Sequence, residues 1–126
     1  MRVLLIYLIA IVLAALSDGW MINDMKVIGH SAEAISILAL LVLPFIHEYK
    51  GGWGWYLASY VFLRVGMFDM VHNLAAGLPI LYHGTTSLWD FVAMKFNPPL
   101  WAEMFGRVLF LFVGVMIPIQ NIKNKV

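Results

Sequence analysis

Residues 3–22 read VLLIYLIAIVLAALSDGWMI, a stretch in which Asp18 is the only charged side chain. A helix of this length rises about 30 Å and so matches the hydrocarbon core of a bilayer. With small residues at Ala15 and Ser17, the stretch also resembles a secretory signal peptide, but its apolar character resumes at Trp20. We therefore expect residues 3–22 to form a retained membrane-spanning helix.

Three further apolar stretches are long enough to span a bilayer, and they cover residues 27–46, 53–74 and 100–119. The sequence of 126 residues is 63% hydrophobic and only 12% charged, with a mean hydropathy of +0.88, unlike an ordinary soluble domain. Four spans leave no room for a separate soluble domain. We predict an all-α integral membrane protein, a four-helix antiparallel transmembrane bundle that forms a single domain over residues 1–126.

The connection between the third and fourth stretches is expected to contain a short helix over residues 88–96. Gly77 and Pro79 end the preceding helix, and Ser87 and Asp90 have the spacing of a capping box. The apolar run that follows predicts a helix in the membrane interface, or one that folds back over the polar side chains as a lid.

The orientation in the membrane follows from the basic residues that flank the four stretches. Arg2, Lys50, Lys123 and Lys125 fall on one side, and Lys26 and Lys95 on the other. By the positive-inside rule, the side with more basic residues faces the cytoplasm. We therefore expect a multi-pass membrane protein with both termini in the cytoplasm.

Each of the four stretches carries a carboxylate, and the four are Asp18, Glu33, Asp69 and Glu103. A charge inside a bilayer costs several kcal/mol unless it is paired, hydrated or neutralised. The helical rise places all four within about 5–10 Å of the outer boundary. This common level predicts one shared polar site.

Other polar residues lie near these acids, because side chains three or four residues apart share a helical face. These sets are His30 with Glu33, Asp69 with His72 and Asn73, and Glu103 with Arg107. Arg64 lies near the middle of its span, so we expect it to face the interior and to pair with an acid on another helix. The predicted ligand-binding residues are Asp18, Glu33, Arg64, Asp69, His72, Asn73, Glu103 and Arg107.

Three functions fit such a layer. The favoured hypothesis is an outward-opening polar pocket that binds or translocates a small polar molecule, an ion or protons. The first alternative is a structural or accessory subunit whose polar layer only holds helices together.

The second alternative is a membrane-embedded enzyme that uses a divalent transition metal. Helical bundles can hold two metal ions with four carboxylates and two histidines. The candidate ligands here are Asp18, His30, Glu33, Asp69, His72 and Glu103. The order His30-x-x-Glu33 reverses the usual Glu-x-x-His pattern, and Arg107 competes with a cation for Glu103.

Composition restricts the remaining function classes. The formal net charge is +1 without a basic run, so we expect no binding to nucleic acid. The absence of cysteine excludes disulfides and thiolate ligands. His47 and His83 fall in connections and are expected to be solvated or interfacial rather than part of the site. The expected partner is the lipid bilayer, and a homo-oligomer or a larger membrane complex is left open.

Overall fold

The computed structural model describes residues 2–43, 53–83, 91 and 95–123, of which only the backbone is described at Trp53 and at 121–123. The described residues form the helices α1 (Arg2–Ile22), α2 (Lys26–Leu41), α3 (Trp53–Ala76) and α5 (Leu100–Lys123), and no strand occurs among them. The predicted all-α class is therefore confirmed for this part of the chain. Each helix falls on one of the four apolar stretches. The expected helix over 88–96 lies largely outside the described residues.

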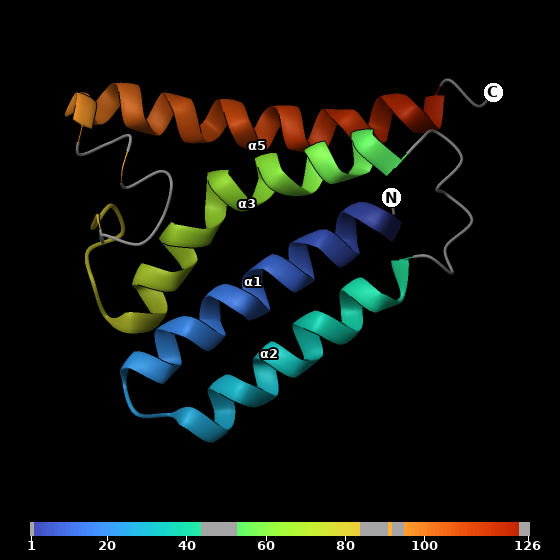
Figure 1. The fold of residues 1–126 in the computed structure, drawn as a ribbon. Coiled ribbons are helices and arrows are strands. Elements are labelled where there is room, and N and C mark those ends of the chain that lie inside the picture. The colour runs from blue at the N-terminus through green and yellow to red at the C-terminus, as the bar shows by residue number, and fades with distance from the viewer. Residues whose placement is uncertain (1, 44–52, 84–90, 92–94, 124–126) are drawn as a thin grey trace.

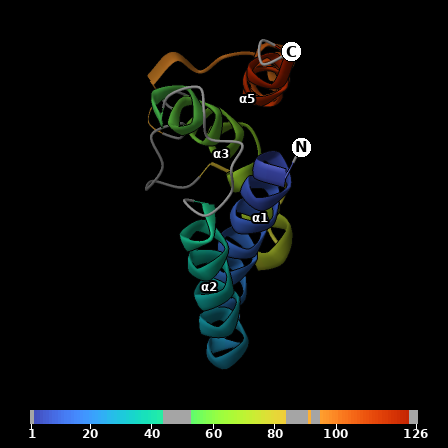
Figure 2. The same cartoon turned by 90° about the vertical axis from the view of Figure 1, so that its right-hand side faces the viewer.

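The helices lie in a row in the order α2, α1, α3, α5 (Figures 1 and 2), and their main contacts are between neighbours in this row. Helices that follow each other along the chain are antiparallel, as expected. The central neighbours α1 and α3 are parallel, because Tyr7 packs against Tyr60 and Gly19 against Ala75. Two antiparallel pairs, α1 with α2 and α3 with α5, are thus joined along the parallel contact between α1 and α3.

We call the outer end of the row the end at which α1 and α3 finish and α2 and α5 begin. The opposite, inner end holds the start of α1 and the last turn of α5 (Figure 1). The largest buried apolar cluster lies toward this inner end, where α1, α2 and α3 meet. Its buried members are Val3, Leu4, Tyr7, Ile11, Leu43, Tyr56 and Leu63.

Small residues bring the helix backbones close together at every main contact. Any side chain at Gly19, Gly29, Gly66 or Gly114 would meet atoms of the neighbouring helix at less than 3 Å. Hydroxyl groups add hydrogen bonds across the same contacts. Ser36 Oγ donates to the carbonyl of Ala10 at 2.8 Å, and Ser59 Oγ donates to that of Gly114 at 2.6 Å. Packing through small residues and serine hydroxyls is typical of helices in membranes.

Within the part of the chain that the structure describes, two helical segments, Arg2–Ile22 and Leu100–Gln120, are long and apolar enough to cross a membrane. Only 17% of the most apolar window of the second is buried, so most of its side chains lie on the surface. One face of α2 is also apolar and exposed, with Val27 exposed to 82% and Leu38 to 60%. Apolar surface on this scale indicates association with a membrane.

Both helices that finish at the outer end stop through the same backbone motif. Gly77 has a φ of +72°, Leu78 N–H donates to the carbonyl of Asn73 and Gly77 N–H to that of Leu74. At the end of α1, Asp24 takes the corresponding position with a φ of 59°. A left-handed residue here lets the last carbonyls of the helix accept hydrogen bonds and reverses the chain sharply.

Candidate functional site

A buried arginine joins α3 to α5 near the outer end. The Arg107 side chain is 1% exposed, and its Nη2 lies 3.1 Å from Glu103 Oε1 and 3.7 Å from Asp69 Oδ2. Arg107 Nε also donates to Glu103 Oε1 at 3.2 Å. The pair within α5 has the four-residue spacing predicted from the sequence. The contact with Asp69 reaches across to the neighbouring helix.

The Glu103 carboxylate is shared between this arginine and a histidine. Its second oxygen, Oε2, lies 3.0 Å from His83 Nε2. Glu103 is 5% exposed and His83 is 29% exposed, so the histidine lies between the buried carboxylate and the surface. Glu103 also belongs to the first turn of α5, where the helix dipole favours a negative charge.

Asn73 holds the segment that carries this histidine. Its side-chain amide is 3% exposed and donates to the carbonyls of Ile80 at 3.2 Å and Tyr82 at 2.9 Å. These bonds fold the chain back after α3. The next residue, His83, is thereby placed against α5. We call Asp69, Asn73, His83, Glu103 and Arg107 the outer cluster.

His72 borders the outer cluster without contacting its charges in the described part of the chain. Its Nδ1 lies 3.3 Å from Asn73 Oδ1, and its ring stacks on Phe68 with centroids 6.3 Å apart. The predicted residues that the structure gathers are therefore Asp69, Asn73, Glu103 and Arg107, with His72 beside them.

His83 was expected to be solvated or interfacial and was left out of the site; the structure places it 3.0 Å from Glu103, with 29% of its side chain exposed. The signal that could have found it is the short chain reversal at Gly77 and Pro79, which returns the following residues to the helix that they just left. A histidine within a few residues of such a reversal lies near the outer end of the row of helices. Its partner on α5 could not be known without the order of the helices.

Arg64 was expected to pair with an acid on another helix, but it forms no such pair among the residues that the structure describes. Its Nη1 lies 3.4 Å from the Tyr60 hydroxyl, and its guanidinium lies 4.1 Å above the Phe68 ring. Both partners belong to α3 itself, one turn away on either side. The guanidinium is held by its own helix because Tyr60 and Phe68 share its face.

The expected convergence of four acids is also corrected, because Asp18 and Glu33 are exposed. Glu33 lies 3.5 Å from His30, with the two side chains 51% and 67% exposed. Among the described residues no group of three or more His, Asp or Glu side chains could hold a metal ion. The sequence placed all the acids at one level but could not give the direction of each side chain.

The outer cluster combines acidic and basic side chains. Asp69 and Glu103 contribute two carboxylates, and Arg107 contributes one guanidinium. The partly exposed His83 lies beside them at the margin of the cluster.

Comparison of the chain with models of protein families, with curated proteins and with solved structures finds no match.

Proposed function

We propose that the protein is a multi-pass membrane protein whose four helices all span the bilayer, with both termini in the cytoplasm and the outer cluster near the external surface. The apolar exposed faces of α2 and α5 and the small-residue contacts between helices support this arrangement. The basic residues at the inner end support the orientation.

Within this arrangement, the outer cluster is a site that takes up one positive charge from outside. The observation that carries this proposal is the pair of carboxylates, Asp69 and Glu103, that contact one buried arginine next to the partly exposed His83. Carboxylate oxygens are the ligands that hard cations prefer, and a carboxylate beside a histidine can take part in proton transfer. The outward-opening pocket expected from the sequence is retained in this narrower form.

The test is the unfolding midpoint of the detergent-purified protein in sodium, potassium or calcium chloride, with N-methylglucamine chloride as the reference at equal ionic strength. A cation that binds only the folded protein stabilises it by about 2.7 kcal/mol at 100 times its Kd. The unfolding midpoint as a function of pH is the corresponding measurement for a proton.

The decisive variant is Asp69→Asn. It removes one of the two carboxylates but keeps the Arg107–Glu103 contact, so it should abolish the response to cations and to protons. Glu33→Gln is the matched control, because it removes an exposed carboxylate outside the cluster. A response that is the same in Asp69→Asn as in the natural sequence would contradict the proposal, as would no response to any cation or proton.

A second candidate function is purely structural, and the burial of Arg107 favours it. A guanidinium that is 1% exposed and contacts acids on two helices holds α3 against α5. On this hypothesis Asp69→Asn lowers the unfolding midpoint by the same amount in every salt. The two functions therefore differ in the dependence on the cation, not in the loss of stability.

A further inference from the structure

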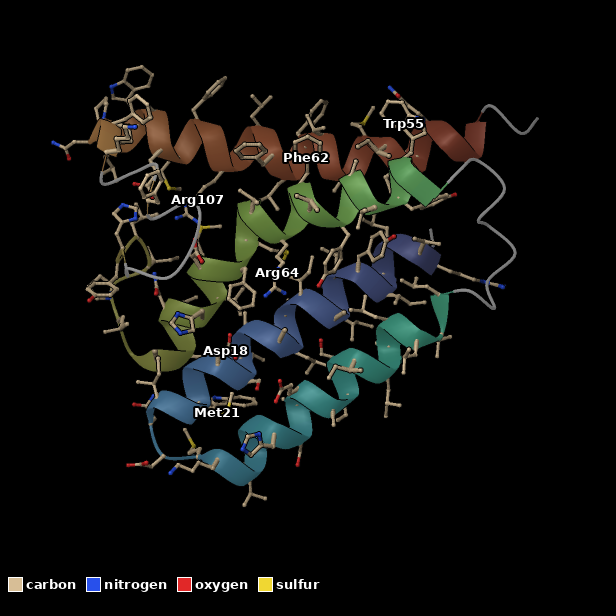
Figure 3. All side chains as sticks on the ribbon, in the orientation of Figure 1. Asp18, Met21, Trp55, Phe62, Arg64 and Arg107 are labelled. Atoms are coloured by element: carbon tan, nitrogen blue, oxygen red, sulfur yellow. The ribbon has the colours of Figure 1, made fainter. Side chains whose placement is uncertain are left out.

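Three charged side chains outside the outer cluster, Asp18, Glu33 and Arg64, lie on one face of the row of helices. On α1, the buried residues Tyr7 and Ile11 and the charged Asp18 lie on one face of the helix, because their spacing follows the helical repeat. Tyr7 and Ile11 belong to the buried apolar cluster, and Asp18 lies beyond it toward the outer end. Figure 3 shows Arg64 reaching from α3 toward α1.

On α2 and α3, the charged residues also share a helical face with side chains that pack against this cluster. On α2, Leu40 packs against it, and Glu33 lies seven residues earlier on the same face. On α3, Tyr60 packs edge-on against Tyr7, and Arg64 is one turn further along. We call Asp18, Glu33 and Arg64 the charged face.

Contacts between the helices give the positions of these side chains between the inner and outer ends of the row. Ser36 is bonded to Ala10 across α2 and α1, and Tyr7 lies against Tyr60 across α1 and α3. Arg64, four residues after Tyr60, is therefore nearly level with Ser36. Glu33 precedes Ser36 by three residues, so it lies about 4.5 Å nearer the outer end.

Neither Glu33 nor Arg64 finds a strong counter-charge within the described part of its own chain. Arg64 is half-buried, contacts Tyr60 and Phe68, and lies about 17 Å from either end of α3. Glu33 has only the exposed His30 beside it. An arginine at this depth of a bilayer is costly unless it meets an acid.

We propose that the charged face is covered by a second copy of this chain, and that Arg64 of each copy pairs with Glu33 of the other. A two-fold axis along the membrane normal, in front of α1, keeps every residue at its own depth and places α3 of one copy opposite α2 of the other. Arg64 and Glu33 differ by about 4.5 Å in position along the membrane normal, which two long side chains can bridge. The planar guanidinium of Arg64 favours an ion pair with a carboxylate. The proposal rests on the membrane arrangement proposed above, but not on uptake of a cation.

The test exploits the absence of cysteine from the sequence. Leu100→Cys, on an exposed position at the start of α5, accepts one fluorophore and lies off the charged face. Energy transfer between donor-labelled and acceptor-labelled copies is measured in liposomes as the protein-to-lipid ratio increases. The natural charged face should give saturable transfer above the level of random proximity.

Charge reversal then identifies the contact. Arg64→Glu alone and Glu33→Arg alone should each weaken association at least tenfold, because each puts like charges opposite each other twice. An equimolar mixture of the two variants should restore it, since both pairs are then opposite in sign. Lys95→Glu, an exposed reversal outside the face, should leave association unchanged.

Three results would overturn the proposal: transfer no greater than random proximity, association insensitive to both reversals, or a mixture that associates no better than its components. Insensitivity to both reversals would assign the contact to another face. If Arg64 instead contacts a different membrane protein, the purified chain should be monomeric in liposomes and give no energy transfer above random proximity. The cation response of the same samples is independent, because Arg64 and Glu33 lie outside the outer cluster, so each proposal can fail alone.

Discussion

Arg107 is the only described cation of the outer cluster, and it lies between two carboxylates. Arg107→Met leaves Asp69 and Glu103 buried without this counter-charge. The free energy of unfolding should fall by about 3–5 kcal/mol, the usual cost of breaking a buried ion pair from one side. Denaturation of the detergent-purified protein, followed by circular dichroism, measures the change.

The control removes all three charges together, as Asp69→Leu, Glu103→Leu and Arg107→Met. Apolar side chains of similar volume often replace a buried ionic group without loss of stability, so this variant should lie within about 1 kcal/mol of the natural sequence. If Arg107→Met alone were equally stable, the guanidinium would not be the counter-charge of these acids.

For single residues, the position of a polar side chain along its helix could be predicted from the sequence, but most of its contacts could not. Helical rise gives depth, and spacing gives pairs within one helix, so Glu103 with Arg107 could be predicted. The contact of Arg107 with Asp69 depends on which helices are neighbours. His83 was missed for the same reason, and Arg64 because its partners Tyr60 and Phe68 are not acids.

Among the elements, the ends of α1 and α3 provide a matched pair of positions. Gly77 is the first residue after α3 and Asp24 the second after α1, and both have positive φ. A side chain in this conformation costs about 1 kcal/mol, which glycine avoids. Asp24→Gly should therefore raise the free energy of unfolding by about 1 kcal/mol, and Gly77→Ala should lower it by a similar amount. Thermal unfolding checks both, and a loss of stability in Asp24→Gly would contradict this explanation.

The contact between α1 and α3 depends on the absence of a side chain at Gly19. A Cβ there would lie 2.5 Å from Ala75 Cβ and 2.7 Å from the His72 carbonyl oxygen. Gly19→Ala should lower the free energy of unfolding by about 1–3 kcal/mol, because the helices must separate.

Gly54→Ala is the control for this prediction. No atom lies within 4 Å of a Cβ at Gly54, so the same change should be neutral or stabilise α3 by up to about 1 kcal/mol. Equal effects of the two substitutions in thermal unfolding would show that helix propensity, not the contact, decides the outcome at Gly19.

The four helices could be predicted because each needs only local information. Apolar runs of sufficient length give the spans, and Gly77 followed by Pro79 gives the end of α3. The order of the helices in space is not local. It depends on where small residues permit close approach, and Gly19 and Gly29 place α3 and α2 on different sides of α1.

For the whole molecule, the proposed two-fold axis passes in front of α1 and brings Asp18 of both copies near each other. Like charges that approach in a membrane weaken association. Asp18→Asn should therefore increase energy transfer at a given protein-to-lipid ratio. Asp24→Asn, in the exposed turn after α1, is the control that should not. A decrease in transfer with Asp18→Asn would place the axis elsewhere.

The parallel contact between α1 and α3 has a consequence for biosynthesis. Tyr7 and Tyr60 touch although 53 residues separate them, whereas α1 with α2, and α3 with α5, form hairpins between successive helices. Each hairpin can form as soon as its second helix leaves the ribosome, before the other hairpin exists. In the membrane arrangement proposed above, insertion would then yield two preformed halves, and the last event of folding would be their lateral docking. Asn23 donates its side-chain amide to the Ala75 carbonyl across this contact at 3.1 Å.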